Sequence, residues 1–345
     1  MNEQEVLFQT RHIWQTCFGD SEEFMNIYFS KKYTATANIT RHADGKVVAA
    51  TQVLPYTLCQ HGDRMPAGYV SGLATLPEYR GQGLAADILR EAHLRLYHSG
   101  AILSLLIPGS ESLRAYYQDC RHGAYETVAF RHEAPLNIAC QPATDVICTP
   151  SQGGDTDEYA FYIEQLMKEP LCLLPSIHDY EAAIMLCRLE KGEIWTARRN
   201  ERIVGWMMVI PENEHRCVIR DIRTADSSVA ASLLQRFKEN DTNSESIIWR
   251  KAVPSAHPQS HPYAMARVVN APLFLQKAAQ RNPHLSTIIE ITNDKDIPDN
   301  NGRYILHQGQ CTRTEVPSET ILTPGKLAAW AFTQEGFHLP LMLDE

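Results

Sequence analysis

The sequence predicts an α+β protein with mixed sheets, in which two units of similar order precede a smaller third unit. Three observations predict this class. Helical patterning near the start gives way to short strands separated by turn residues, a glycine-containing loop joins an apolar strand to an amphipathic helix, and the same order of elements then recurs. The chain has 345 residues, of which 44% are hydrophobic and 21% charged. This length and composition allow more than one hydrophobic core.

The first unit covers residues 1–136 and begins with apolar residues at helical spacing between Ile13 and Phe29. Three antiparallel strands are expected next, with turns at Asp44-Gly45 and Gly62-Asp63. The remaining expected elements are a helix from Leu84 to Tyr97, a buried strand over Ala101–Ile107, a short helix over Ser112–Tyr117 and a strand over Gly123–His132.

The second unit covers residues 137–255, and its polar start, Asn137–Asp157, contains prolines and glycines typical of a linker. The elements expected after it are helices over Tyr159–Lys168 and Tyr180–Leu189, a hairpin over Glu193–Ile210 that turns at Asn200-Glu201, a strand over Arg216–Ile222, a helix over Ser227–Glu239 and a strand over Ile247–Lys251. This order repeats that of the first unit.

The third unit covers residues 256–345 and overlaps a proline-rich hinge at Pro254–Pro262. Its pattern predicts a small α+β domain with a strand at Met265–Val268, a helix at Pro272–Arg281, strands at Ser286–Thr292 and Arg303–Gln310, and a helix at Pro324–Phe332.

Charge and hydropathy exclude several classes of function. The net charge is -9, so we expect no nucleic-acid partner and favour cationic ones. No apolar run approaches the roughly 20 residues of a membrane span. The first residues lack the basic region of a signal peptide. We therefore expect a cytoplasmic protein without a membrane span.

We expect no metal site. The nine cysteines are scattered and never form a pair with two residues between them, which is typical of reduced thiols. His257 and His261 could bind zinc, but no second ligand pair lies near them and prolines surround them. Residues 293–299 resemble a calcium loop superficially, yet Lys295 interrupts the acidic pattern and the acid expected at the twelfth position is missing. We interpret this segment as a turn between strands.

The most informative stretch joins the strand that ends at Pro77 to the helix that begins at Leu84. A strand, a loop of small residues and a helix start point unpaired backbone N–H groups and the positive helix end at one place, which suits a diphosphate. Gly81 and Gly83 leave room for the phosphates, and Arg80 adds a charged donor.

Two other interpretations of this loop stay open. Residues 81–86 also satisfy the Gly-x-Gly-x-x-Ala pattern of dinucleotide-binding proteins. In that fold an acid about 20 residues later ends the next strand, whereas Pro108-Gly109 follows the next strand here. The loop could also be a purely structural turn and helix cap.

At these residues the chain resembles the GNAT acetyltransferase superfamily, whose signature is Arg/Gln-x-x-Gly-x-Gly/Ala; Arg80, Gly83 and Ala85 fill it. The preceding Ala74-Thr75-Leu76-Pro77 and the later Tyr116-Tyr117 fall where that family places its donor strand and its late tyrosine. The sequence departs from the family at Arg121, where a glycine usually follows that tyrosine by four residues.

The order of all three units is similar to the Eis branch of that superfamily, which has two GNAT-like domains and a sterol-carrier-like C-terminal domain. The resemblance implies a catalytic domain in residues 1–136, a degenerate GNAT-like domain in 137–255 and a sterol-carrier-like domain in 256–345. In the second of these the strand-to-helix junction, residues 221–228, has no glycine, and Asp226 begins the helix, so we expect no coenzyme A there. The resemblance also implies a homo-oligomer.

The function implied is transfer of the acetyl group of acetyl-CoA to a primary amine, such as an aminoglycoside, a polyamine or a lysine side chain. The alternative is a module that binds coenzyme A or an apolar ligand without turnover. By the resemblance, the strand residues Leu73, Ala74 and Thr75 bind the pantetheine arm and the loop residues Arg80, Gly81, Gln82, Gly83, Leu84 and Ala85 bind the diphosphate. Tyr117 is the implied general acid, and the C-terminal carboxylate, which belongs to Glu345, is the implied group that orients or deprotonates the amine.

Overall fold

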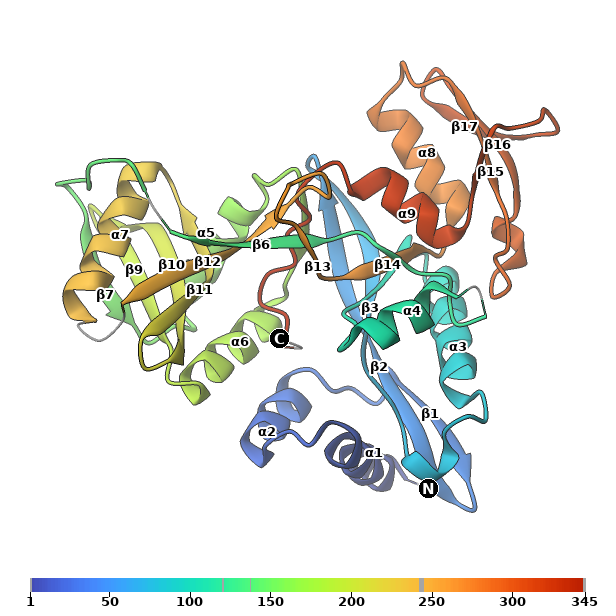
Figure 1. Ribbon diagram of the computed structural model, residues 1–345, viewed down its shortest axis with the longest axis horizontal. Coiled ribbons are helices and arrows are strands. Elements are labelled where there is room, and N and C mark those ends of the chain that lie inside the picture. The colour runs from blue at the N-terminus through green and yellow to red at the C-terminus, as the bar shows by residue number, and fades with distance from the viewer. Residues whose placement is uncertain (1, 120, 137, 242–244, 344–345) are drawn as a thin grey trace.

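The computed structural model is described here for residues 2–119, 121–136, 138–241 and 245–343 (Figure 1). It contains three mixed sheets with helices packed against them, so the predicted α+β class with mixed sheets is confirmed. In the described part of the chain, no helix is both long enough and apolar enough to cross a membrane.

The first sheet holds the three-stranded meander that the sequence predicts. Its order is β1 (Asn38–Ala43), β2 (Lys46–Gln60), β3 (Asp63–Thr75), β4 (Leu103–Leu106), β14 (Met265–Val268) and β5 (Glu126–Thr127). β1 pairs with the first half of one edge of β2, and β8 (Leu171–Leu174) pairs with the second half. The helices of this region are α1 (Glu3–Phe18), α2 (Glu22–Lys31), α3 (Leu84–His98) and α4 (Glu111–Gln118).

The second sheet has the order β13 (His261–Pro262), β6 (Phe130–Pro135), β12 (Ser246–Val253), β11 (Arg216–Thr224), β10 (Arg202–Asn213), β9 (Glu193–Arg199) and β7 (Ile147–Ser151). Its helices are α5 (Thr156–Leu166), α6 (Ile177–Leu189) and α7 (Ser227–Asn240). The expected hairpin turn is confirmed, because Asn200 and Glu201 both have positive φ. The expected linker is wrong in part: β7 lies within it, pairs with β9 and forms the edge of the sheet. An edge strand tolerates a proline such as Pro150.

The third sheet has the order β17 (Gln310–Thr314), β16 (Gly302–His307), β15 (Thr287–Ile291) and β18 (Thr320–Leu322). It is accompanied by α8 (Ala271–Arg281), α9 (Pro324–Phe332) and the short 3-10 helix η2 (Pro298–Asn300). Apolar residues of α8 and α9, such as Phe274 and Phe332, share one buried cluster with Leu105 of the first sheet. The third sheet is therefore attached to the first sheet through a continuous core.

Two strands cross between the regions that the sequence separates. β14 pairs with β4 and β5 in the first sheet, although it lies about 160 residues after β4 in the chain. The expected single strand over Gly123–His132 divides into β5 and β6, and β6 leaves to join β12 in the second sheet. The division at residues 1–136, 137–255 and 256–345 stays a prediction.

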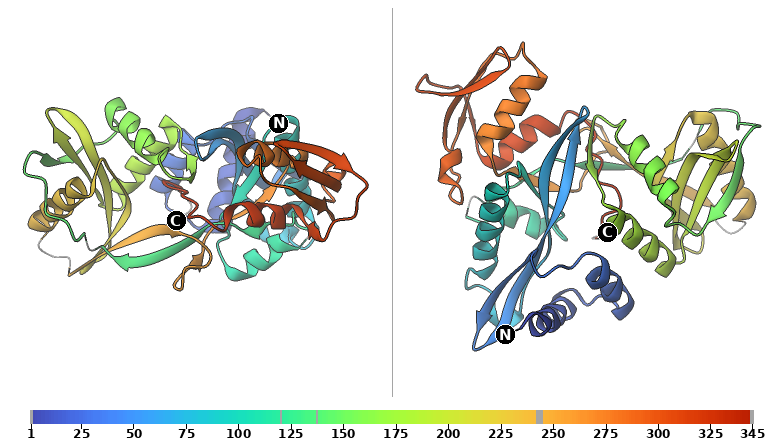
Figure 2. Two further views of the ribbon diagram at one scale, coloured as in Figure 1. Left: turned by 90° about the horizontal axis from the view of Figure 1, so that it is seen from above. Right: turned by 180° about the vertical axis from the view of Figure 1, so that it is seen from behind.

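The chain returns to the middle of the molecule at its end. Residues near the C-terminus run between α6 and the first sheet (Figures 1 and 2). His338 exchanges backbone hydrogen bonds with β8. Leu341 and Leu343 then enter the buried cluster that contains Trp14 of α1 and Leu186 of α6. This tail thus joins the α1 region to the second unit.

A buried ion pair also joins these regions. The ammonium group of Lys32, at the end of α2, pairs with the carboxylate of Asp179 in the first turn of α6. Lys32 also donates a hydrogen bond of 2.6 Å to the hydroxyl of Tyr56 on β2. Asp179 accepts a 2.7 Å hydrogen bond from the backbone N–H of Ser176 and so completes the cap of α6.

We predict that Asp179→Ala lowers the free energy of unfolding by about 3 kcal/mol or more, because removing one partner of a buried pair leaves the other charge uncompensated. Urea denaturation measures the change. The neighbouring variant Glu181→Ala is the control, since its ion pair with Lys31 is half-exposed and such pairs contribute about 0–1 kcal/mol. Equal effects of the two substitutions would contradict this account.

Candidate active site

Strands β3 and β4 pair only over a short stretch and then part. Their parallel register covers Ala67 with Leu103, Gly68 with Ser104 and Tyr69 with Leu105. β4 ends at Leu106, whereas β3 continues to Thr75. The second half of β3 thus turns a row of backbone groups toward a gap in the sheet, where a ligand can add hydrogen bonds as a strand would.

A bulge in β3 lies beside this gap and allows α1 to pack closely against the strand. The register between β2 and β3 shifts near Gly72, which has a φ of 63°. A Cβ atom at Gly72 would lie 2.0 Å from a ring carbon of Trp14. Only glycine therefore allows both this backbone conformation and the close approach of α1.

The loop after β3 opens α3 without a side-chain cap. η1 (Pro77–Tyr79) leads to Gly81 and Gly83, with φ values of 76° and 81°, and Gly83 is the N-cap residue of α3. Because Gly83 has no side chain, the first N–H groups of the helix keep no side-chain acceptor. These donors and the positive end of the helix make a site for an anion.

Arg80 lies across the end of β3. Its Nε donates a 3.0 Å hydrogen bond to the carbonyl oxygen of Thr75, and the side chain is exposed. The guanidinium group is thereby held beside the glycine loop, where it adds a positive charge to the helix end. This placement fits a residue that binds phosphate oxygens.

A cavity of about 1320 Å³ lies where the strand gap, the loop and α4 meet. Its lining includes the predicted donor residues Leu73, Ala74, Thr75, Arg80, Gly81, Gly83, Leu84 and Ala85, together with Tyr117. Gln82 is exposed and does not line the cavity. The structure thus brings nearly all the predicted donor residues and the predicted acid to one surface; their roles remain predictions.

Tyr117 occupies the inner wall of the cavity on α4. It is 7% exposed, and burial raises the pKa of its phenol well above the usual value. Its ring contacts those of Tyr116 and Tyr125, and no residue in the described part of the chain forms a hydrogen bond with its hydroxyl. The phenol is therefore protonated at neutral pH and is free to donate to a group in the cavity.

One residue of this wall, His122, is not indicated by the sequence pattern. His122 lines the cavity, and its ring stacks on Tyr116 with centroids 4.0 Å apart. Its Nδ1 atom is buried and has no hydrogen-bond partner among the described residues. The signal that could have indicated it is the departure at Arg121, directly before it, where the family pattern has glycine.

The opposite wall is aromatic and acidic. Trp14, Phe18 and Phe24 from α1 and α2 line it together with Leu189 at the end of α6 and the neighbouring Glu190, whose carboxylate pairs with Arg220 at 3.4 Å. Asp20, between α1 and α2, also lines the cavity and accepts a 2.7 Å hydrogen bond from the indole N–H of Trp14.

The tail reaches the same cavity. Leu343 is part of its lining, whereas Glu345 lies outside the residues that the structure describes. A carboxylate at the cavity from Glu345 thus remains a prediction.

The second sheet offers no equivalent loop. At its strand-to-helix junction the Asp226 carboxylate caps α7 and accepts a 3.0 Å hydrogen bond from the N–H of Val229. An acid in this position occupies the helix N–H groups and repels a phosphate.

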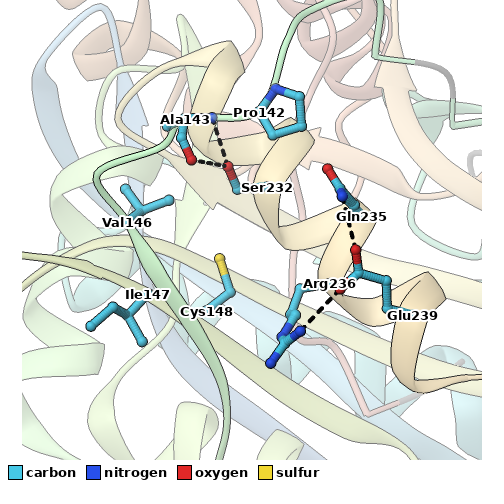
Figure 3. Close-up of a pocket in the computed structure, with 9 residues that line it drawn as sticks. All are labelled: Pro142, Ala143, Val146, Ile147, Cys148, Ser232, Gln235, Arg236 and Glu239. Carbon is cyan, nitrogen blue, oxygen red and sulfur yellow. Dashed lines mark hydrogen bonds and ion pairs between the residues drawn. The ribbon is translucent and has the colours of Figure 1, made fainter.

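A smaller cavity of about 330 Å³ does lie beside α7 (Figure 3). However, its polar side chains bond to one another or to the backbone: Gln235 and Arg236 both donate to Glu239, and Ser232 bonds to Ala143. Among all the described residues, no group of three or more His, Cys, Asp and Glu side chains is arranged to hold a metal ion.

Comparison with known proteins identifies a protein family that matches most of the first unit. Residues 3–120 match the family model described as "Acetyltransferase (GNAT) domain". No curated protein matches the sequence significantly. The chain therefore contains a GNAT acetyltransferase domain, a fold that supports acyl transfer from an acyl-CoA donor.

Solved structures share the fold of almost the whole chain. A GCN5-related N-acetyltransferase from Anabaena variabilis is 18% identical with a TM-score of 0.78, over 95% of this chain and 87% of that one. Eis1 from Mycobacterium abscessus is 11% identical with a TM-score of 0.74, over 96% and 88%. A GCN5-related N-acetyltransferase from Kribbella flavida is 17% identical with a TM-score of 0.71, over 95% and 86%. The similarity in fold thus extends through all three sheets.

We predict that Gly83→Val weakens acetyl-CoA binding by about a hundredfold or more, because a branched side chain strains the left-handed backbone and covers the helix N–H groups. Calorimetric titration with acetyl-CoA measures the loss. Gly62→Val is the matched control: its φ is 88°, and like Gly83 it has open space where the Cβ would lie, but it belongs to the β2–β3 turn. Unchanged affinity in Gly83→Val would contradict the donor site.

Proposed function

We propose that the protein is an N-acetyltransferase that moves the acetyl group of acetyl-CoA directly to a primary amine, such as an aminoglycoside, a polyamine or a lysine side chain. The observation that carries this proposal is the single cavity in which the glycine loop, the free edge of β3 and Tyr117 meet. The similarity in fold to Eis1 supports the place of the chain in an Eis-like branch. By this proposal the third sheet belongs to a sterol-carrier-like domain.

The donor occupies the side of the cavity formed by β3 and α3. The diphosphate binds at Gly81 and Gly83 with Arg80 beside it, and the pantetheine arm bonds to the backbone of Leu73, Ala74 and Thr75. This arrangement uses the unpaired second half of β3, since an extended arm with amide groups replaces the missing strand. The thioester then lies at the inner end of the gap, where Tyr117 lines the wall.

The acceptor enters between the α1–α2 region and α6. Aromatic side chains and the carboxylates of Asp20 and of Glu190, which also pairs with Arg220, line this side, and a carboxylate attracts a cationic group. A primary alkyl amine has a pKa of about 10 and is mostly protonated at neutral pH. The acidic wall therefore supports a cationic amine as the acceptor, in agreement with the negative net charge of the chain.

The proposed reaction has three proton transfers around one acyl transfer. A carboxylate of Glu345 accepts a proton from the ammonium group, and the neutral amine nitrogen attacks the carbonyl carbon of the thioester. The carbon–sulfur bond then breaks, the Tyr117 hydroxyl donates its proton to the departing thiolate, and the second proton that the amide nitrogen loses passes to the resulting Tyr117 phenolate. The raised pKa of Tyr117 keeps the phenol protonated at neutral pH, so the proton is present when the thiolate forms.

Thiol release from acetyl-CoA in the presence of spermidine, an aminoglycoside and a lysine peptide tests the activity. We expect release with at least one cationic amine, and Tyr117→Phe should reduce kcat by about a hundredfold while acetyl-CoA affinity stays the same. Tyr116→Phe is the control, since that ring stacks on His122 and keeps doing so without its hydroxyl. Because the pKa of Tyr117 is raised, deprotonation of this group should not reduce the rate below about pH 10.

Coenzyme A binding without thiol release from any amine would favour the alternative, a binding module without turnover. Near-normal kcat in Tyr117→Phe would show that Tyr117 is not the general acid, but it would not contradict the proposed acetyl transfer.

Deletion of residues 344–345 tests the proposed base separately. Leu343 lies on the cavity wall directly before them, so the deletion removes or displaces the Glu345 carboxylate, and such displacement lowers kcat by about a hundredfold. Acetyl-CoA affinity, measured by titration, should not change. Asp344→Ala, which keeps Glu345, is the control and should retain activity; full activity in the deletion variant would place the base elsewhere.

A further inference from the structure

Six polar side chains form a continuous buried cluster behind the wall that carries Tyr117. We call it the His93 cluster, and its members are Ser104, Tyr125, His93, Asp296, Arg267 and Asp294. The Tyr125 hydroxyl lies 2.7 Å from Ser104 Oγ and 2.8 Å from His93 Nε2. Asp296 Oδ2 lies 2.7 Å from His93 Nδ1 and 3.3 Å from Arg267. The proposed function does not use any of these groups directly.

The protonation states of Asp296 and His93 determine which group donates and which accepts in each hydrogen bond of the cluster. Burial and the nearby charge of Arg267 lower the pKa of His93 to about 4, so its ring is neutral at pH 7. The ionised carboxylate of Asp296 can only accept, hence His93 Nδ1 carries the proton and Nε2 accepts from Tyr125. Tyr125 in turn accepts from Ser104. Each member therefore has one arrangement, and Tyr125 is held at both sides of its hydroxyl.

Tyr125 is also the contact between the cluster and Tyr117. Its backbone N–H donates a 2.9 Å hydrogen bond to the carbonyl oxygen of Tyr117. The two rings meet edge to face with centroids 6.1 Å apart. A displacement of Tyr125 thus moves both the backbone and the ring environment of Tyr117.

Arg267 holds the turn between these tyrosines. It donates a 2.8 Å hydrogen bond to the carbonyl oxygen of Gly123. Gly123 has a φ of 112°, and a Cβ atom there would lie 2.7 Å from the Tyr125 ring and 3.2 Å from His93. The turn is therefore packed closely against both Tyr125 and His93.

The two carboxylates of the cluster come from the third sheet. Asp294 and Asp296 lie in the loop between β15 and η2, which lies beside α3 (Figures 1 and 2). Asp294 pairs with Arg267 at 2.6 Å, and both side chains are almost fully buried. The Asp294 carboxylate also accepts hydrogen bonds from the Asn300 side chain and from the N–H of Ile297. These hydrogen bonds within the segment also hold the loop in its conformation.

We propose that Asp296, acting through His93 and Tyr125, is a positioning residue for Tyr117. The loop of the third sheet thereby sets the geometry of proton donation in an active site to which it contributes no wall. This inference rests on the proposed role of Tyr117 as the acid. It assigns a catalytic purpose to a part of the chain that lies outside the GNAT match at residues 3–120.

Kinetics of Asp296→Ala in the full chain give the first test. We expect kcat with an accepted amine to fall about tenfold or more, because small displacements of a reacting group lower rates strongly, while acetyl-CoA affinity stays within about twofold. Asp296→Asn keeps an oxygen that accepts from His93 and should restore most of the rate. Asp299→Ala removes an exposed carboxylate from η2, directly after this loop, and should behave as the unaltered protein.

Fluorine NMR of a chain with 3-fluorotyrosine at position 117 gives a test that needs no acceptor. The Tyr117 resonance should shift or broaden in Asp296→Ala and in Tyr125→Phe, and stay unchanged in Asp299→Ala. Tyr125→Phe keeps the ring and the backbone N–H, so a folding defect in Asp296→Ala does not decide the question. An unchanged resonance in folded Asp296→Ala and Tyr125→Phe would overturn the proposal. Absence of transfer to every amine would instead overturn the proposed function, whatever the resonance does.

Discussion

The separation of β3 from β4 after their third residue pair is the constraint on which the site depends. A sheet that stayed paired would satisfy the backbone of β3 internally and would leave no gap at its centre. Because β4 ends at Leu106, the second half of β3 keeps free backbone groups beside the start of α3. The bulge at Gly72, the uncapped helix at Gly83 and the position of Tyr117 all have a use only if that gap exists.

The remaining elements keep the gap open and enclose it. α1 approaches β3 at Gly72, and the Lys32–Asp179 pair and the tail at Leu343 connect α1 and α2 with α6. β14 extends the sheet beyond β4 and carries Arg267 into the His93 cluster. Residues from three distant parts of the sequence therefore complete the cavity, whereas its donor side is formed by segments that are adjacent in the chain. This explains how one chain can hold a common donor site and a separate acceptor wall.

The donor side could be predicted from the sequence because its signals are local. The strand before Pro77, the glycines at 81 and 83 and the helix after them stand next to each other in the chain. The acceptor wall, His122 and the His93 cluster could not be predicted in this way, because they depend on contacts between distant segments. The pairing of β14 with β4 leaves no trace in the local pattern of either strand. The local pattern predicts only a turn at Asp294 and Asp296, whereas in the structure their carboxylates bind Arg267 and His93.

A crystal structure of the full chain with coenzyme A tests the central claim most directly. The account predicts one coenzyme A per chain, with its diphosphate at Gly81 and Gly83, its pantetheine arm along the second half of β3, and its sulfur next to the Tyr117 hydroxyl. It also predicts no coenzyme A at Asp226 of the second sheet. Coenzyme A bound away from β3, or a β3–β4 pair that closes along its whole length in the complex, would contradict the account.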